Sequence, residues 1–144
     1  MPAYKVYAWE RERWPEYREV KLTLNEATRY VRKLCRHFKL GMPYIRGGKH
    51  LGAADYSPGF WKNIETGFYD FDGRIRFTTN DISLGTVCHE FAHHLNYKRN
   101  GNGKGKWHGK TFKRELKRVY TWAKRYLPEK VETELPTSGI DKGA

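Results

Sequence analysis

Residues 81–99 read DISLGTVCHEFAHHLNYKR, and this stretch decides the fold. Apolar residues recur in it at the three- and four-residue spacing of an amphipathic helix. They are Ile82, Val87, Cys88, Phe91 and Leu95. Asp81 or Ser83 can cap the start of the helix, and Asn100-Gly101 can end it. The pattern therefore predicts a helix over residues 81–99.

Inside this predicted helix, His89-Glu90-Phe91-Ala92-His93 has the form HExxH. Positions i and i+4 lie one turn apart on the same face, so both imidazoles can reach one metal ion with Glu90 beside them. This ligand set suits Zn²⁺. Because zinc lowers the pKa of a bound water towards ~7, a neighbouring carboxylate can take its proton. We predict one catalytic zinc, with Glu90 as general base and acid.

A catalytic zinc usually has three protein ligands, so a third ligand is needed. We predict His108, because the glycine-rich loop before it lets the chain fold back onto the first two imidazoles. Glu115 is the alternative ligand, although we expect it to pair with Arg118 at i, i+3 instead. The longer pattern HExxHxxGxxH is excluded, because Asn96 and Arg99 replace its glycine and third histidine.

The other histidines are not predicted to bind the metal. His94 follows His93 directly, so it points away from the shared face, and we expect it behind the ligands or on the surface. His37 and His50 have no partner at ligand spacing. Tyr97 lies near the motif as a candidate oxyanion donor, which the sequence alone does not place.

Secondary structure is predicted outward from this helix. Residues 3–9 have the composition of a short strand. Thr23 and Glu26 form a capping-box pattern before a helix that Gly41 and Pro43 end. Residues 44–79 alternate glycines with short aromatic and β-branched runs, a pattern typical of a small antiparallel sheet.

Two further elements complete the prediction. Asp72-Gly73 is the strongest hairpin-turn signal in the chain. An amphipathic helix is expected over residues 111–127, with one apolar and one cationic face. The result is an α+β fold in one domain over residues 1–127, followed by a disordered tail over 128–144.

Composition limits the class of protein. The chain has 144 residues and two cysteines, Cys35 and Cys88, which excludes a disulfide framework and a cysteine-based zinc finger. No signal-peptide core or membrane-length apolar run is present, so we expect a soluble, cytoplasmic protein, monomeric and without a membrane partner.

Positive charge is concentrated in one segment. The net charge of the chain is +12, and residues 98–130 hold 12 Lys and Arg against two Glu, a net +10. Basic residues beside an exposed ring suit phosphate contact and base stacking, so DNA is a candidate partner. The candidate contacts are Lys104, Lys106, Trp107, Lys110, Lys113, Arg114, Lys117 and Arg118.

The two histidine motifs together, HEFAHH and HGKTF, with the preceding segment LGAADY…GFYDFDGRIRFTTNDISLGTVCHE, resemble the SprT-like zinc metallopeptidases. These are relatives of the Spartan proteases that cleave DNA-crosslinked proteins. The resemblance covers roughly residues 22–126 and implies zinc on His89, His93 and His108 with Glu90 catalytic. The four-cysteine zinc ribbon of many bacterial members is absent from this sequence.

The sequence therefore predicts a zincin-like α+β fold: an antiparallel sheet with an N-terminal helix, the HExxH helix and a C-terminal basic helix. The expected function is a zinc-dependent metalloendopeptidase acting on protein or peptide substrates, including proteins associated with DNA. One alternative is a nucleic-acid-binding module with a structural zinc. Another is a zinc hydrolase acting on a non-peptide amide, because the same activated water would serve.

Overall fold

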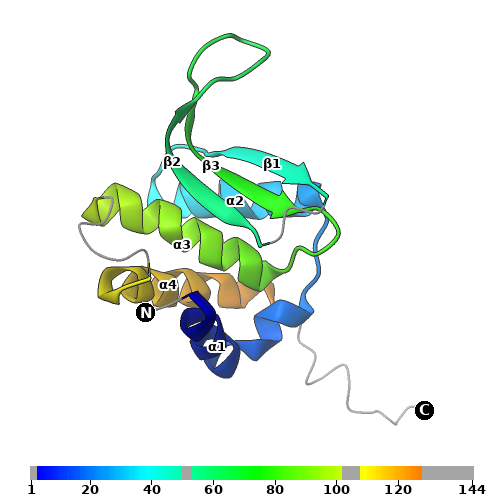
Figure 1. The fold of residues 1–144 in the computed structure, drawn as a ribbon, viewed down its shortest axis with the longest axis vertical. Helices are drawn as coiled ribbons and strands as arrows, with labels where there is room; N and C mark the ends of the chain where they lie inside the picture. The colour runs from blue at the N-terminus through cyan, green and yellow to red at the C-terminus, as the bar shows by residue number, and fades with distance from the viewer. Residues whose placement is uncertain (1–2, 50–52, 102–107, 128–144) are drawn as a thin grey trace.

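Helices pack against a small three-stranded sheet in the computed structural model, which describes residues 3–49, 53–101 and 108–127 (Figure 1). The α-helices are α1 (Ala3–Arg13), α2 (Leu24–Phe38), α3 (Leu84–Asn100) and α4 (Lys110–Ala123). Two short 3-10 helices are η1 (Pro15–Glu19) and η2 (Lys124–Tyr126). The strands are β1 (Tyr44–Gly48), β2 (Asp55–Trp61) and β3 (Phe71–Thr78). The α+β class is confirmed.

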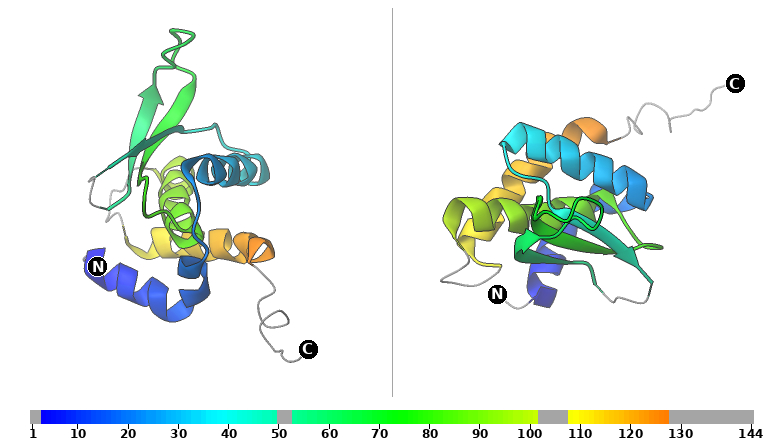
Figure 2. Two further views of the ribbon diagram at one scale, coloured as in Figure 1. Left: turned by 90° about the vertical axis from the view of Figure 1, so that its right-hand side faces the viewer. Right: turned by 90° about the horizontal axis from the view of Figure 1, so that it is seen from above.

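Helix α3 is the central element. Twelve of its 17 residues are buried, because it packs against the sheet, α2, α4 and η1. Figure 2 shows α3 between the sheet and α4. The predicted helix is confirmed, and of the two proposed caps Ser83 is the one used: its hydroxyl accepts a hydrogen bond from the Thr86 backbone N–H (3.1 Å). Gly101 ends the helix with a φ of 80°.

The capping box at the start of α2 is confirmed. The Thr23 hydroxyl accepts from the Glu26 backbone N–H (3.1 Å), and the Glu26 carboxylate accepts from the Thr23 N–H (2.8 Å). The helix ends before the predicted glycine, because Lys39 already adopts the left-handed conformation with a φ of 60°. Its apolar face, including Val31 and Leu34, is buried in the common core.

The sheet is mixed, which corrects the prediction of an antiparallel sheet. The strand order is β1-β3-β2; β2 runs antiparallel to β3, whereas β1 runs parallel to it. The chain crosses from one edge to the other between β1 and β2, so β3 inserts between two strands that are neighbours in sequence. Alternate residues of β3, among them Ile75 and Phe77, are buried against the helices.

The predicted hairpin turn at Asp72-Gly73 is wrong, because both residues lie inside β3. The β2–β3 connection spans residues 62–70 instead. Gly73 has a φ of 89°, and a Cβ at this position would lie 2.6 Å from the Tyr56 hydroxyl. The glycine therefore makes room for a neighbouring ring within the sheet, next to an irregular register between Ser57 and Phe60 of β2.

The predicted strand over residues 3–9 is also wrong, because these residues form the first turns of α1. Val6 and Glu10 lie one turn apart on the same helix face and are both buried. One of these two positions is charged, so the helical repeat of apolar residues is too weak to be recognised in the sequence. The helical conformation of α1 therefore depends on its tertiary contacts.

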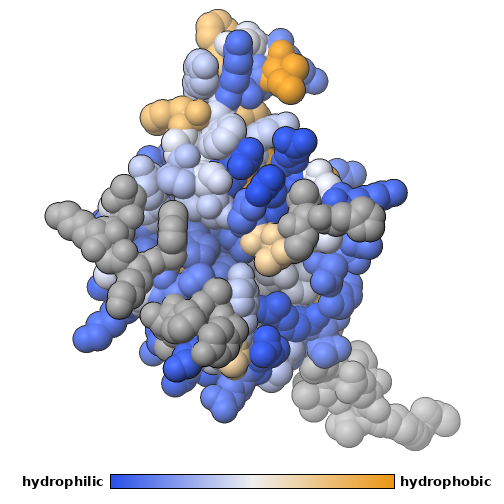
Figure 3. All heavy atoms as spheres, in the orientation of Figure 1, coloured by the Kyte–Doolittle hydropathy of each residue, from blue (hydrophilic) through white to orange (hydrophobic). Residues whose placement is uncertain are grey.

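The C-terminal helix is confirmed with a modified end: α4 stops at Ala123 and continues as η2. The proposed tail over 128–144 lies outside the described residues, and the single-domain organisation stays a prediction. Within the described ranges, no helix combines the length and the apolar character needed to cross a membrane. Figure 3 shows apolar side chains at the projecting end of the sheet, where Phe60 near the end of β2 and Ile64 and Phe68 in the β2–β3 connection are exposed.

Candidate metal centre and active site

Three imidazoles meet on one side of α3, two from α3 itself and one from just before α4. His89 and His93 lie one turn apart on α3, and His108 precedes α4, which begins after the Gly109 cap. One ligand atom from each residue lies within 4.8 Å of the other two. The ring centroids of His89 and His93 are 5.0 Å apart, and that of His108 is 4.9 Å from His93. The structure therefore brings together all three predicted ligands.

The Phe112 ring contacts all three imidazoles of this cluster. It lies one helical turn after His108 and is fully buried. Its ring stacks on His93 with centroids 4.3 Å apart and also contacts His89 (5.1 Å) and His108 (5.0 Å). The phenylalanine of the HGKTF motif therefore has a physical role, because it packs one apolar ring against every imidazole of the cluster.

The donor atoms fit a metal ion. The Nε2 atoms of His89 and His108 are buried and have no hydrogen-bond partner among the described residues. A buried polar atom without a partner is costly, whereas coordination to a cation would satisfy it. Three imidazole nitrogens are a familiar ligand set for zinc, with the fourth position left for water.

Glu10 fixes the orientation of His89. Its carboxylate accepts a hydrogen bond from His89 Nδ1–H, which leaves the Nε2 lone pair free to face a metal. The second carboxylate oxygen accepts from the Tyr120 hydroxyl (2.8 Å), so the buried charge is held from two sides. Burial acts to lower the pKa of His89, but the Glu10 hydrogen bond and nearby carboxylates outweigh it and raise that pKa.

Burial keeps the other two imidazoles neutral, as metal ligands must be. It holds the pKa of His93 well below its usual range, and the charge of a protonated His89 adds to the effect. Burial also lowers the pKa of His108 to about 4, again with a contribution from His89. Both rings therefore offer a lone pair at neutral pH.

Glu90 lies in the wall of the cavity beside the cluster. This cavity of about 210 Å³ is lined by Tyr7, Ala54, Asp55, Tyr56, Glu90, His93 and His108. Within the described part of the chain, no hydrogen bond engages the Glu90 carboxylate. Burial raises the pKa of that carboxyl to about 7, against the lowering effect of His89. A carboxylate with such a pKa can exchange protons near neutral pH.

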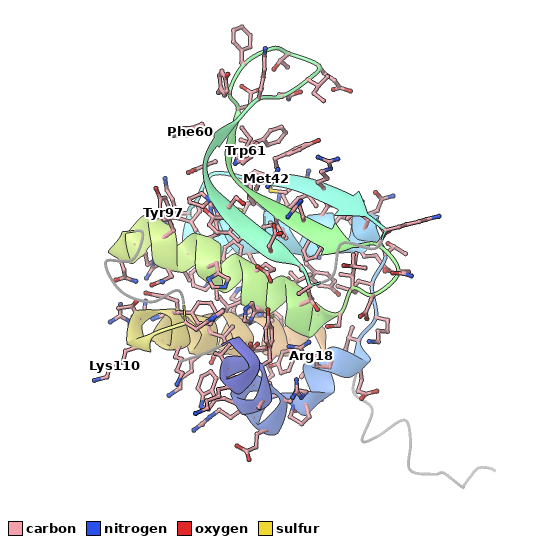
Figure 4. The ribbon with its side chains drawn as sticks, viewed as in Figure 1. Arg18, Met42, Phe60, Trp61, Tyr97 and Lys110 are labelled. Atoms are coloured by element: carbon pink, nitrogen blue, oxygen red, sulfur yellow. The ribbon has the colours of Figure 1, made fainter. Side chains whose placement is uncertain are left out.

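Tyr7 is a better-placed donor than Tyr97. The Tyr7 ring stacks on His89 (centroids 4.6 Å apart) and lines the cavity. Burial raises the pKa of its hydroxyl to about 12, so the phenol keeps its proton. Tyr97 lies toward the C-terminal end of α3, as Figure 4 shows, and does not line the cavity.

His94 points away from the imidazole cluster, as predicted, but it is buried in the core, so of its two predicted locations the surface is wrong. Its Nε2–H donates to the Gly41 carbonyl (2.9 Å), and Nδ1 therefore accepts from the Tyr56 hydroxyl (2.9 Å). Because its partners are in and beside the sheet, it does not face the imidazole cluster. His37 stacks on Trp122 (5.1 Å), and His50 lies outside the described residues.

Glu115 pairs with Arg118 as predicted (3.8 Å) and also with Arg114 (3.3 Å). It is buried, and its carboxylate also accepts a hydrogen bond from Asn100 (3.1 Å), so it links α4 to α3 and does not belong to the histidine cluster.

Of the candidate DNA contacts, Lys104, Lys106 and Trp107 lie outside the described residues. Lys110, Lys113, Arg114, Lys117 and Arg118 lie on α4, and Figure 4 shows Lys110 pointing outward at its start.

Sequence reasoning missed the residues that α1 and η1 supply, namely Tyr7, Glu10 and Arg18. Each reaches the site from a segment at least 70 positions before His89. No spacing rule links such distant residues, and a buried glutamate looks like an ordinary surface residue in a sequence. The only local signal in the sequence is that Val6 and Glu10 are spaced by one helical turn, and this spacing alone is too weak to predict that Glu10 is buried.

Comparison with protein-family models matches residues 75–133 to the SprT-like family, which confirms the resemblance. The match includes β3 from Ile75, the HExxH helix, His108 and α4, whereas α1, η1, α2, β1 and β2 precede it. Comparisons with curated proteins and with solved structures found no match.

Proposed function

We propose that this chain, SprT-like over residues 75–133, is a zinc-dependent metalloendopeptidase. The observation that carries the proposal is the convergence of three histidine ligand atoms within 4.8 Å beside the cavity that contains Glu90. His89, His93 and His108 hold the ion. When bound, zinc supplies Lewis-acid activation of a water molecule and of the scissile carbonyl.

The residues of the chain perform the proton transfers. Glu90 accepts the proton of the attacking water and returns it to the amine that leaves. Its carboxylate faces the cavity without a competing hydrogen bond from the described residues, which supports this role. The Tyr7 hydroxyl lines the same cavity and is available to donate to the substrate carbonyl oxygen.

An extended peptide suits the shape of the site. Strand β2 is an edge of the sheet, and its residues Asp55 and Tyr56 line the cavity next to His93 and Glu90. An edge strand offers unpaired backbone groups to which an extended peptide can add. The proposal therefore favours peptide bonds over small non-peptide amides, which could not use this edge.

Glu90→Gln tests the mechanism. We expect hydrolysis of an unfolded protein substrate such as casein to fall by about a hundredfold or more, because the amide cannot take a proton. Bound zinc, measured by atomic absorption, should stay at one equivalent. Glu12→Gln on the exposed face of α1 is the control and should keep full activity. Full hydrolysis by zinc-loaded Glu90→Gln would exclude Glu90 as the base.

A second candidate function is nucleic-acid binding, with the basic 98–130 segment as the contact. Its specific support is a groove of about 460 Å³ between α2 and α4. Basic residues Lys117, Arg118 and Arg125 line it beside the Trp122 ring, a combination suited to phosphate contact and stacking. In this reading the zinc is structural and Glu90 has no catalytic role.

Fluorescence anisotropy with single- and double-stranded oligonucleotides tests this second function. We expect binding at low salt that weakens steeply as salt is added, and that Lys117→Gln reduces. The variant Lys62→Gln, at an exposed position of the β2–β3 connection, is a charge-matched control. Absence of binding at low salt, or binding that does not respond to salt, would contradict the proposal.

A further inference from the structure

A second cavity, of about 370 Å³, lies next to the three-histidine cluster. It is lined by Tyr7, Arg11, Arg18, Ala53, Ala54, Thr78, Asp81, Thr86, His89 and Glu90. Three of these residues, Tyr7, Ala54 and Glu90, also line the smaller cavity beside His93 and His108. A peptide whose scissile bond lies at Glu90 would therefore extend into this second cavity.

Arg18 packs against α3 and Tyr7 in this cavity. Its side chain crosses the first turn of α3, where a Cβ at Gly85 would lie 3.2 Å from Arg18 Nε. Its guanidinium carbon lies 5.8 Å from the centroid of the Tyr7 ring. Figure 4 shows Arg18 between α1 and the start of α3. The absence of a side chain at Gly85 permits this close approach.

Among the described residues, no carboxylate forms a hydrogen bond or ion pair with the Arg18 guanidinium, and Arg18 Nη2 is buried without a partner there. Asp81 lines the same cavity, but its carboxylate pairs with Lys21 (3.7 Å). The carboxylate of Glu10 is engaged by His89 and Tyr120. Because Arg18 lines the cavity and has no ion-paired carboxylate among the described residues, an anionic ligand entering the cavity would gain charge-assisted hydrogen bonds from the part of the guanidinium that faces it.

We propose that Arg18 binds a carboxylate of the substrate, from an acidic side chain or from a peptide C-terminus, next to the bond to be cleaved. This inference rests on the proposed peptidase function and adds a substrate class to it. A planar guanidinium matches a carboxylate with two parallel hydrogen bonds. A recess of this size accepts one or two residues of a peptide, whereas nucleic-acid binding requires a series of phosphate contacts along an open surface.

A binding experiment separates this proposal from catalysis. The protein is zinc-loaded Glu90→Gln, and the probes are fluorescein-labelled alanine hexapeptides with one Glu moved through each position, or Gln in its place. Each peptide is made with a free and with an amidated C-terminus. We expect at least one Glu peptide, or the free-acid form, to bind about tenfold tighter than its neutral counterpart, as one charge-assisted hydrogen bond requires.

Arg18→Met should abolish this preference, and Arg18→Lys should retain part of it, because a lysine keeps the charge but loses the planar fork. Arg36→Met, at an exposed position of α2, is the matched control and should keep the full preference. The Glu-position series and the amidated peptides identify which of the two carboxylates is bound.

Three results would overturn the proposal. One is equal binding of charged and neutral peptides; another is a preference that survives undiminished in folded Arg18→Met. A third is Arg18-dependent binding of oligothymidine in place of the acidic peptides, which would make the cavity a phosphate site. Hydrolysis of the same peptides by the unmutated protein is scored separately, so loss of the peptidase function is distinguishable from loss of the carboxylate site.

Discussion

Glu10 lies outside the segment that matches the SprT-like family, yet it forms a hydrogen bond with the predicted metal ligand His89. Its hydrogen bond to Nδ1 sets the tautomer and the ring orientation that the metal requires. We predict that Glu10→Gln lowers zinc affinity about 10- to 100-fold, because the amide is a weaker acceptor than the carboxylate. Competition with a chromophoric chelator measures the change.

Glu12→Gln, on the exposed face of the same helix, is the control for Glu10→Gln and should leave zinc affinity unchanged. The two variants remove the same charge from α1, so a difference between them reports the hydrogen bond to His89. Equal zinc affinity of Glu10→Gln and the unmutated protein would show that Glu10 does not position the ligand.

The separation of partners in sequence explains which site residues could be predicted. His89, Glu90 and His93 lie within one helical turn, so their spacing alone predicts a shared face. His108 could also be predicted, because it follows a glycine-rich segment of the sequence and begins a second histidine motif, HGKTF. Glu10 contacts His89 across 79 positions, and only the folded packing of α1 against α3 brings them together.

Helices could be predicted correctly where the pattern of apolar and capping residues in the sequence agrees with the contacts that the helix makes in the folded protein. The capping box of α2 and the amphipathic patterns of α3 and α4 are of this kind, because the face that repeats in sequence is the face that is buried. The Asp72-Gly73 pair misled because a glycine with positive φ is needed both in hairpin turns and where another residue approaches the backbone. Here the approaching residue is Tyr56.

Gly67 and Gly73 allow the cost of a positive φ to be measured separately from the cost of a clash with a neighbouring side chain. Gly67, with a φ of 79°, has no atom within 4 Å of the position a Cβ would take, so Gly67→Ala incurs backbone strain alone, about 1 kcal/mol. In Gly73→Ala the new methyl also collides with Tyr56, and we expect destabilisation by about 3 kcal/mol or more. Urea unfolding measures both variants. Equal losses would mean that the Tyr56 ring moves aside without cost.

For the whole molecule, α3 lies between the sheet and α4 (Figure 2), and the three-histidine cluster lies where α1, α3 and the start of α4 meet. Two ligands come from α3, one precedes α4, and α1 supplies the carboxylate behind His89. The parallel pairing of β1 with β3 could not be predicted, because it depends on which strands become neighbours after the chain crosses the sheet.

Because its ligands bridge two helices, zinc should stabilise the entire fold. A ligand at 100 times its dissociation constant stabilises the folded state by about 2.7 kcal/mol, so we expect a chelator such as EDTA to lower the melting temperature by several degrees. The His108→Ala variant should melt at a lower temperature in zinc and respond less to EDTA, since the bridge to α4 is lost. Differential scanning calorimetry at fixed zinc concentration measures both effects. An identical melting temperature with and without EDTA would show that metal binding is not coupled to the packing of α4 on α3.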